Sequence, residues 1–251
     1  MSVNILTKKP PRSAPDPGKR MLKVGGITPF TATDYPGQIA AVVFVQGCPW
    51  RCGYCHNPHL QPRVQESPLD WSRIRSLLKR RIGLIDAVVF SGGEPTIDPN
   101  LEGAIREVRD MGFKVGLHSG GIYQNRFREI LPLLDWIGFD IKAPFDHRYE
   151  RITGAADSAD AALDGARAVI SSGIDYEFRT TVHPALLAED DIMELAQTLS
   201  GMGATNYALQ LFREQGCGST ALKLAAESGF PGDELVQRVA ALFPKFTLRG
   251  N

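Results

Sequence analysis

The sequence predicts an α/β fold, a partial (β/α)6 barrel of parallel strands. Short apolar segments alternate with amphipathic ones about six times along the chain, which is the pattern of a parallel sheet with right-handed crossovers. The first apolar segment, IAAVVFVQ at residues 39–46, lacks polar alternation, as expected for a strand buried on both faces. The 251 residues suit one such domain, and six units leave the barrel open, since a closed one has eight.

The elements are expected in strand–helix order. A helix at residues 69–81 follows the first strand, and Asp70 is a suitable N-cap for it. Gly112 and Gly173 end two later helices, because glycine readily adopts the left-handed conformation that terminates a helix. The later strands are expected at residues 87–91, 114–118, 135–142, 175–182 and 206–212, with a terminal strand at 246–249. The later helices are expected at about residues 100–111, 124–134, 158–172, 189–200 and 233–243.

The composition is that of an ordinary globular chain without excess charge. The 28 Lys and Arg residues balance the 28 Asp and Glu residues, which argues against a nucleic-acid binder, because sequence-independent affinity needs clustered positive charge. No apolar run reaches the roughly 18 residues of a membrane span, and the N-terminus has no apolar signal segment. We therefore expect a cytoplasmic protein with no nucleic-acid and no membrane partner.

Two regions differ in composition. Residues 1–20 contain five Lys and Arg residues and four prolines but no apolar periodicity, so we expect a disordered basic tail. Residues 21–251 contain no internal repeat, linker or low-complexity stretch. We expect them to form a single domain.

Three of the four cysteines lie within eight residues, directly after the first predicted strand. Cys48, Cys52 and Cys55 have the spacing C-x3-C-x2-C, whereas Cys217 is alone far downstream. In the cytosol, a tight cysteine cluster is more often a metal site than a disulfide framework. Three thiolates on a loop at the carboxyl end of a strand can hold three corners of a [4Fe–4S] cluster and leave the fourth iron open to a small-molecule chelate.

Two other interpretations of the cysteine motif remain open. The three clustered cysteines and His56 would make a Cys3His zinc set, although adjacent residues seldom both reach one tetrahedral ion. Three structural cysteines without a metal are the plainest alternative. We expect Cys217 to be an incidental loop thiol, because one cysteine cannot hold an auxiliary cluster.

The cysteine motif, with Tyr54 before its last cysteine, resembles the signature of the radical S-adenosylmethionine (SAM) superfamily. The resemblance implies that Cys48, Cys52 and Cys55 hold a [4Fe–4S] cluster whose fourth iron is chelated by the amino and carboxylate groups of SAM, with Tyr54 beside the cofactor. Electron transfer would then cleave the sulfonium to a 5′-deoxyadenosyl radical. The fold of that superfamily is a partial (β/α)6 barrel, in agreement with the strand count.

Gly92, Gly93 and Glu94 close the second predicted strand. Two glycines let a backbone approach a ligand closely, and a glutamate offers a carboxylate to an ammonium group. Taken alone, this tripeptide is common in ordinary strand-to-helix turns. Placed one strand downstream of the cysteine loop, it resembles the GGE motif of the superfamily, which implies contact with the amino group of SAM.

The strand at residues 175–182 carries charged residues on one face. Its alternation puts Glu177, Arg179 and Thr181 together, and one face of each barrel strand lines the interior. An unpaired charge there costs several kcal/mol to desolvate. Either Glu177 and Arg179 pair with each other near an exposed strand end, or Arg179 clamps the carboxylate of the cofactor or a substrate. In the second case Thr181 is a nearby hydroxyl donor.

Asp140 and Lys142 share one face of the preceding predicted strand, where they form either a salt bridge or a functional pair. They resemble the D-x-K motif of glycyl-radical activases, which implies a place close to the cofactor and the peptide substrate. His118 and Ser119 stand where these activases usually read Leu-Asp-Thr-Asn-Gly. Both side chains can hydrogen-bond a ribose, although His118 supplies no fixed negative charge.

Further segments narrow the resemblance to one group of activases. TDYPG at residues 33–37, CHNP at 55–58, YEFRTT at 176–181 and QLFR at 210–213 are similar to activating proteins of anaerobic ribonucleoside-triphosphate reductase. The resemblance implies that flavodoxin or ferredoxin reduces the cluster, and that the radical takes a hydrogen atom from a glycine of the reductase. The alternatives are activation of another glycyl-radical enzyme such as pyruvate formate-lyase, small-molecule radical chemistry, and a zinc-stabilised binding protein without catalytic activity.

Overall fold

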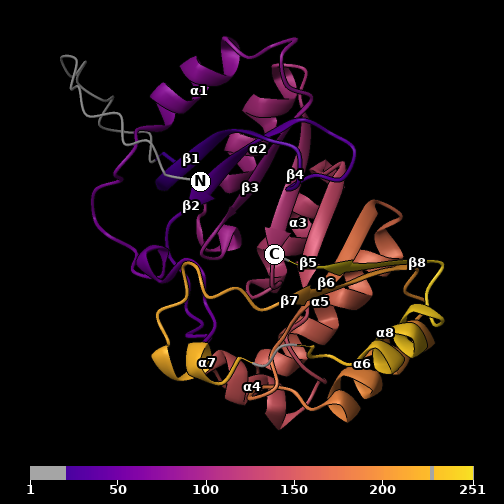
Figure 1. The fold of residues 1–251 in the computed structure, drawn as a ribbon. Helices are drawn as coiled ribbons and strands as arrows, with labels where there is room; N and C mark the ends of the chain where they lie inside the picture. Colours follow the sequence, from indigo (N-terminus) through magenta and orange to yellow (C-terminus); the bar gives the residue numbers. More distant parts are fainter. Residues whose placement is uncertain (1–20, 227–228, 251) are drawn as a thin grey trace.

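The structure is a computed structural model that describes residues 21–226 and 229–250. The predicted basic tail, residues 1–20, lies outside the described residues. In the described part, one sheet holds eight strands that follow one another from β1 to β8 in sequence order (Figure 1). β1 is antiparallel to β2, and every later neighbouring pair is parallel. β1 and β8 are the two ends of this order, so the sheet is open, which is compatible with a partial barrel.

The strands are β1 (Val24–Thr31), β2 (Ala40–Val45), β3 (Ala87–Gly92), β4 (Lys114–Ser119), β5 (Trp136–Asp140), β6 (Asp175–Val182), β7 (Asn206–Leu211) and β8 (Lys245–Arg249). The helices are α1 (Trp71–Lys79), α2 (Leu101–Asp110), α3 (Gln124–Ile130), α4 (His147–Thr153), α5 (Ser158–Ser172), α6 (Glu189–Gly201), α7 (Thr220–Leu224) and α8 (Asp233–Ala240). Short 3-10 turns lie at η1 (Pro58–Leu60), η2 (Pro95–Ile97) and η3 (Leu131–Leu133).

The predicted alternation of strands and helices is confirmed from β2 to β8. Asp70 caps α1 by accepting a hydrogen bond from Ser72 N at 2.8 Å, and Gly173 ends α5 with φ of 73°. The prediction was wrong at β1, which we treated as a segment before the first strand. Its sequence, VGGITPFT, contains two glycines and a proline, which disfavour strands and are tolerated mainly at a sheet edge. The short helices α4 and α7 were also not predicted.

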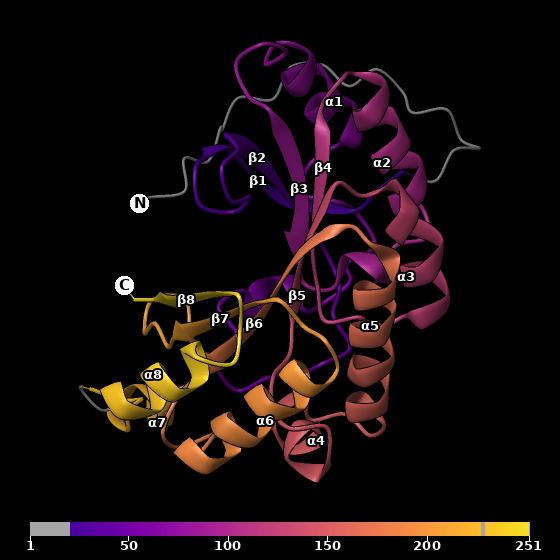
Figure 2. The same cartoon turned by 90° about the vertical axis from the view of Figure 1, so that its right-hand side faces the viewer.

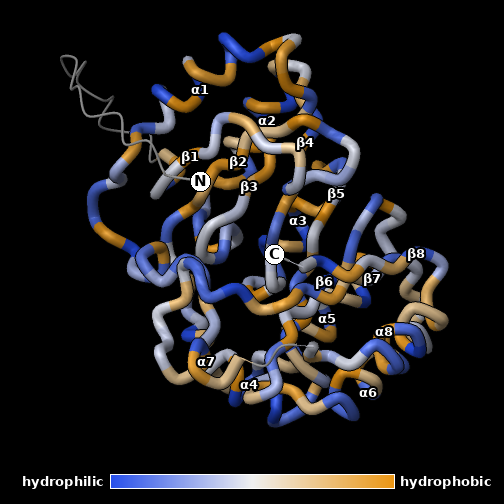
Figure 3. The backbone as a smooth tube through the Cα atoms, viewed as in Figure 1, coloured by the Kyte–Doolittle hydropathy of each residue, from blue (hydrophilic) through white to orange (hydrophobic). Residues whose placement is uncertain are grey.

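Helices α2, α3 and α5 lie along one face of the sheet (Figure 2). The main core, between this face and the helices, contains fully buried side chains such as Phe90, Leu117, Phe139 and Phe178. Helices α1 and α8 change between hydrophobic and hydrophilic residues along their length, as surface helices do (Figure 3). Within residues 21–226 and 229–250, every helix is too short or too polar to cross a membrane.

The opposite face of the sheet, here called the inner face, carries small residues and a second apolar group. That group consists of Tyr35, Ala40, Val42, Ala87, Val89 and Trp136. Tyr35 belongs to the loop between β1 and β2, and its ring lies 5.1 Å from the Trp136 ring. The loop therefore folds over the inner face near the amino end of β5, and leaves the carboxyl ends of the strands for the site described below.

We expect Gly165→Ala in α5 to destabilise the protein although alanine favours helices. A Cβ at Gly165 would lie 2.5 Å from Cζ of Phe139, a fully buried ring that packs at 5.5 Å from Phe127 and 5.9 Å from Phe178. Overpacking costs about 1–3 kcal/mol and exceeds the helix-propensity gain of about 1 kcal/mol. Urea denaturation should show a free energy of unfolding lower by about 1 kcal/mol.

The matched control is Gly103→Ala in α2. A Cβ at Gly103 meets nothing within 4 Å, so only the helix propensity changes. This variant should raise the free energy of unfolding by about 0.5–1 kcal/mol. Equal effects of the two substitutions would contradict the packing described for α5.

Candidate functional site

The carboxyl ends of β2 to β6 meet at one edge of the sheet, because these strands are parallel. In the strand register, Val45 faces Gly92, Ser119 faces Phe139 and Asp140 faces Arg179. The loop after β2 carries Cys48, Cys52, Tyr54 and Cys55, and the turn after β3 carries Gly93 and Glu94. All the residues predicted to hold a cofactor thus lie on or directly after neighbouring strand ends.

Gly92 and Gly93 make room for the backbone that leads into the cysteine loop. A Cβ at Gly92, whose φ is +121°, would lie 2.4 Å from the Val45 carbonyl oxygen. A Cβ at Gly93 would lie 2.3 Å from the carbonyl oxygen of Gly47. The same carbonyl accepts a hydrogen bond of 2.8 Å from the backbone N–H of Glu94. The two glycines therefore join β3 tightly to the cysteine loop, before any ligand is considered.

The cysteine loop is also held from the side of β4 and α4. The backbone N–H of Arg51 donates to the Thr153 carbonyl at 2.7 Å. The Trp50 ring packs edge-on against Tyr149 at 5.8 Å, and a Cβ at Gly120 would lie 2.6 Å from that indole. The loop is therefore fixed by backbone bonds and aromatic packing. Trp50, Gly120 and α4 were not among the predicted site residues.

The three loop cysteines are free, half-buried thiols on one short, fixed segment. Burial, with the nearby Glu94 carboxylate, raises the pKa of Cys48 to about 12, and burial also raises the pKa of Cys52. Such thiols become thiolates only when a positive group compensates the charge. This donor set fits an iron–sulfur cluster, which takes thiolate ligands.

His56, the fourth residue of the Cys3His zinc alternative, is fastened at the end of the cysteine loop. His56 Nε2 lies 3.1 Å from the carbonyl oxygen of Arg213, and because a carbonyl only accepts, this nitrogen donates. In the described part of the chain, no three His, Cys, Asp or Glu side chains are grouped to hold one metal ion. His56 instead fastens the end of the cysteine loop to the segment after β7.

Glu94 is enclosed and accepts four hydrogen bonds within the protein, three at Oε1 and one at Oε2. Its Oε1 accepts hydrogen bonds from the Thr96 backbone, the Thr96 hydroxyl and the Ser119 hydroxyl, the last at 2.8 Å. Its Oε2 accepts from the Gly120 backbone N–H at 3.0 Å. Burial raises the pKa of this carboxyl group, against the effect of these bonds. Glu94 and Ser119 thus tie the end of β3 to the end of β4, whereas a free carboxylate was expected.

Asp140 lies between two buried cations on neighbouring strand ends. Arg179 Nε donates to Asp140 Oδ1 at 3.2 Å and Arg179 Nη2 to the Gly138 carbonyl at 3.0 Å. Lys142 Nζ lies 3.6 Å from Asp140 Oδ2. Burial would raise the pKa of Asp140, but Arg179 and Lys142 hold it below its usual value. Arg179 and Lys142 carry two positive charges and Asp140 carries one negative charge, so the three side chains together have a net positive charge. Such a group of side chains favours a bound anion.

The alternative ion pair between Glu177 and Arg179 is wrong. Glu177, 1% exposed, accepts from Arg249 Nη2 at 2.7 Å, and Arg179 turns to Asp140 instead. Thr181, two residues beyond Arg179 on β6, is half-buried. The partner of Glu177 comes from β8, two strands away, a position that no local pattern could reveal.

His118 does not face the strand ends as a free side chain. Its Nε2 donates to the Asp34 carbonyl oxygen at 2.9 Å, so it fastens the loop between β1 and β2 to the inner face. Burial, together with the charge of Arg179, lowers the pKa of His118 to about 4. The ring is therefore neutral at pH 7 and holds that loop in place. The TDYPG segment at residues 33–37 marks this loop in the sequence, but its spacing does not show that His118 is its partner.

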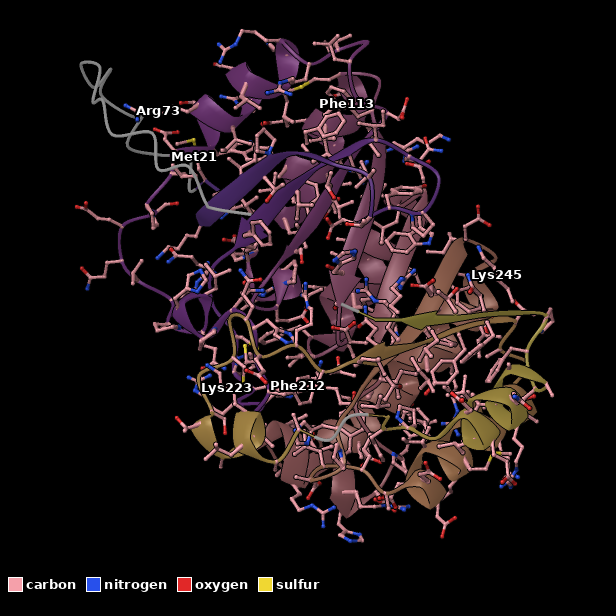
Figure 4. All side chains as sticks on the ribbon, in the orientation of Figure 1. Met21, Arg73, Phe113, Phe212, Lys223 and Lys245 are labelled. Atoms are coloured by element: carbon pink, nitrogen blue, oxygen red, sulfur yellow. The ribbon has the colours of Figure 1, made fainter. Side chains whose placement is uncertain are left out.

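Cys217 is buried rather than incidental. Its Sγ lies 3.6 Å from the carbonyl oxygen of Gly53, inside the cysteine loop. A Cβ at Gly216 would lie 2.7 Å from the His56 carbonyl oxygen. The segment between Phe212 and Lys223, whose ends are labelled in Figure 4, therefore packs on the cysteine loop, and α7 lies beside that loop in Figure 1. These contacts join residues more than 150 positions apart, so no local sequence pattern indicates them.

The profile of the Radical SAM superfamily matches residues 42–199, which include the cysteine loop and the strand ends from β2 to β6. The chain belongs to the radical SAM superfamily. Members of this superfamily use a [4Fe–4S] cluster and SAM, and one solved relative, SuiB of Streptococcus suis, has been seen with SAM bound.

Two sequence relatives of this radical SAM chain are named as glycyl-radical enzyme activating enzymes. One from Methanocaldococcus jannaschii is 28% identical over 210 residues, 75% of this chain and 79% of the relative. The pyruvate formate-lyase-activating enzyme of Clostridium pasteurianum is 29% identical over 188 residues, 72% of this chain and 78% of the relative.

Solved structures agree on the fold. SuiB bound to its precursor peptide superposes with a TM-score of 0.67 at 13% identity, over 83% of this chain, which spans about half (48%) of SuiB. A domain of a pyruvate-formate lyase-activating enzyme from Bacteroides vulgatus superposes with a TM-score of 0.52 at 16% identity, over 66% of this chain and 99% of that domain.

Proposed function

We propose that this radical SAM protein activates a glycyl-radical enzyme, with Cys48, Cys52 and Cys55 as the ligands of its [4Fe–4S] cluster. The observation that carries the proposal is the convergence, at one sheet edge, of three free thiols with Arg179, Asp140 and Lys142, which together carry a net positive charge. When bound, the reduced cluster and SAM supply a 5′-deoxyadenosyl radical, which removes a hydrogen atom from a glycine of the partner. The protein's own residues bind, orient and enclose these groups.

Arg179 is the proposed partner of the SAM carboxylate. Arg179 is 8% exposed, and its guanidinium is held by Asp140 and by the Gly138 carbonyl. Gly138 leaves the space that the guanidinium occupies, since a Cβ there would lie 2.5 Å from Arg179 Cζ. A guanidinium fixed in this way can offer its remaining N–H groups to a carboxylate. Thr181 follows on the same strand face as a hydroxyl donor.

The turns after β3 and β4 are the proposed binding edge for the rest of SAM. Gly92, Gly93 and Glu94 take the amino group, with Tyr54 and Ser119 beside the cofactor. The enclosed carboxylate of Glu94 supports this role by fixing both turns, since two of its hydrogen bonds come from Thr96 and the other two come from Ser119 and Gly120. Asp140 and Lys142 lie next to this edge and remain the proposed catalytic pair.

We propose anaerobic ribonucleoside-triphosphate reductase as the partner, and flavodoxin or ferredoxin as the electron donor. Support comes from the TDYPG, CHNP, YEFRTT and QLFR segments, and from the open sheet, which leaves a side through which a peptide loop can approach. Pyruvate formate-lyase is the second candidate, because the Clostridium pasteurianum relative is named for its activation.

The test is electron paramagnetic resonance (EPR) of anaerobic mixtures. Reduced, cluster-loaded protein, SAM and the anaerobic ribonucleotide reductase of the same organism should give a glycyl doublet. The same mixture should give none when the reductase's radical-bearing glycine is replaced by alanine. A doublet with pyruvate formate-lyase alone would move the assignment to that partner. No doublet with either enzyme would overturn the activase function.

A further inference from the structure

Lys142 is a buried ammonium group embedded beside the cysteine loop. Its side chain is 12% exposed, and Nζ lies 3.6 Å from Asp140 Oδ2. The ammonium also lies 5.7 Å from the Tyr54 ring centroid and 5.9 Å from the Trp50 ring centroid. Trp50 lies between the first two loop cysteines, and Tyr54 lies between the last two. The ammonium thus lies over one aromatic ring from each half of the cysteine motif, and aromatic faces attract cations.

The charge of Lys142 persists at neutral pH despite burial. Burial alone would lower the pKa of this amine, but Tyr54 and the Asp140 carboxylate raise it well above its ordinary value. Asp140 is shared with Arg179, whose Nη2 lies 3.1 Å from Asp140 Oδ1. One carboxylate therefore faces two cations, and part of the Lys142 charge stays uncompensated on the side of the loop.

We propose that Lys142 raises the reduction potential of the [4Fe–4S] cluster and that Asp140 lowers it. The inference rests on the proposed cluster site at Cys48, Cys52 and Cys55. Reduction adds one negative charge to the cluster, and a buried positive charge nearby favours the more negative state, whereas a buried carboxylate opposes it. Lys142 acts here through space as a positioned charge.

This role differs from a peptide-binding one. The ammonium is already engaged by Asp140 and by the two rings, and little of it is open to a partner. A peptide-binding lysine would change the response to the partner enzyme. A charge that tunes the cluster changes the protein before SAM or partner is added.

The experiment is a potentiometric titration of the reconstituted full-length protein, followed by EPR of the reduced cluster, without SAM and without partner. Lys142→Met keeps an unbranched side chain of similar length but removes the charge, and we expect a more negative midpoint potential. At a fixed potential, the ratio of reduced to oxidised cluster should fall about tenfold, which is about 59 mV for one electron. Lys142→Arg should retain most of the wild-type potential.

Asp140→Asn provides the test of opposite sign. It leaves Lys142 and Arg179 unopposed, so the midpoint should become less negative. Lys114→Met, at the exposed amino end of β4 and away from the loop, should leave the midpoint unchanged. If Lys142→Met assembles no cluster, the shift in Asp140→Asn still decides the proposal.

Two results overturn the inference, and they are distinguishable. A cluster that forms in all variants with one common midpoint would remove the electrostatic role of Lys142 and Asp140, and would leave the proposed function standing. A wild-type protein that takes up no [4Fe–4S] cluster would overturn the proposed function and this inference with it.

Discussion

Replacing any one of Cys48, Cys52 or Cys55 with alanine is expected to abolish the reconstituted [4Fe–4S] cluster and all reductive cleavage of SAM. In the proposed site each thiolate binds one iron, and the loop has no further thiol to replace it. Iron and sulfide content, the visible iron–sulfur absorbance and the yield of 5′-deoxyadenosine measure the loss.

Cys217→Ala is the matched control for the cysteine series. Cys217 is buried and contacts Gly53 of the loop, but it is not a proposed ligand. The variant should keep its iron content and its cleavage activity. Full iron loading in Cys52→Ala, or loss of the cluster in Cys217→Ala, would show that the ligand assignment is wrong.

Arg179→Ala is expected to weaken SAM binding while the cluster is retained. The substitution removes the proposed charge-assisted hydrogen bond to the SAM carboxylate, worth about 1.5–3 kcal/mol, which corresponds to a dissociation constant roughly 10- to 150-fold higher. Isothermal titration of SAM into the reconstituted protein measures the change. Arg179→Lys should fall between wild type and alanine, because it keeps the charge but loses the planar fork.

Arg109→Ala is the control for the cofactor titration. Arg109 is an exposed arginine at the end of α2 that pairs with Asp135, before the amino end of β5. Its loss should leave the SAM affinity unchanged. An unchanged affinity in Arg179→Ala as well would place Arg179 in a purely structural ion pair with Asp140.

The parallel topology made much of the site predictable. Uninterrupted apolar segments identified β2 and β3, and parallel strands bring their carboxyl ends to one edge. The cysteine loop, Glu94, Asp140 and Arg179 were therefore expected near one another, and the strand register brings their strand ends together. The place of Glu94 and Asp140 beside the cofactor came from the resemblance to radical SAM motifs, whereas the strand alternation alone put Arg179 on the inner face.

The partners of these residues could not be read from the sequence. Periodicity gives the face of a strand but not the residues that pack on it. Glu177, two residues away, was therefore considered as the partner of Arg179, whereas Asp140 on the neighbouring strand binds it. Glu177 itself pairs with Arg249, 72 residues later. The same limit hid the packing of Trp50 on Gly120 and of Cys217 on the cysteine loop, which depend on long-range contacts.

The central claim, that this protein generates a radical that takes hydrogen from a partner's glycine, is tested most directly by isotope transfer. Anaerobic ribonucleotide reductase labelled with deuterium at its glycine α-carbons is mixed anaerobically with the reduced, cluster-loaded protein and SAM. Mass spectrometry of the recovered 5′-deoxyadenosine should show one deuterium, in an amount that follows the EPR doublet. A doublet accompanied by 5′-deoxyadenosine without deuterium would contradict the account.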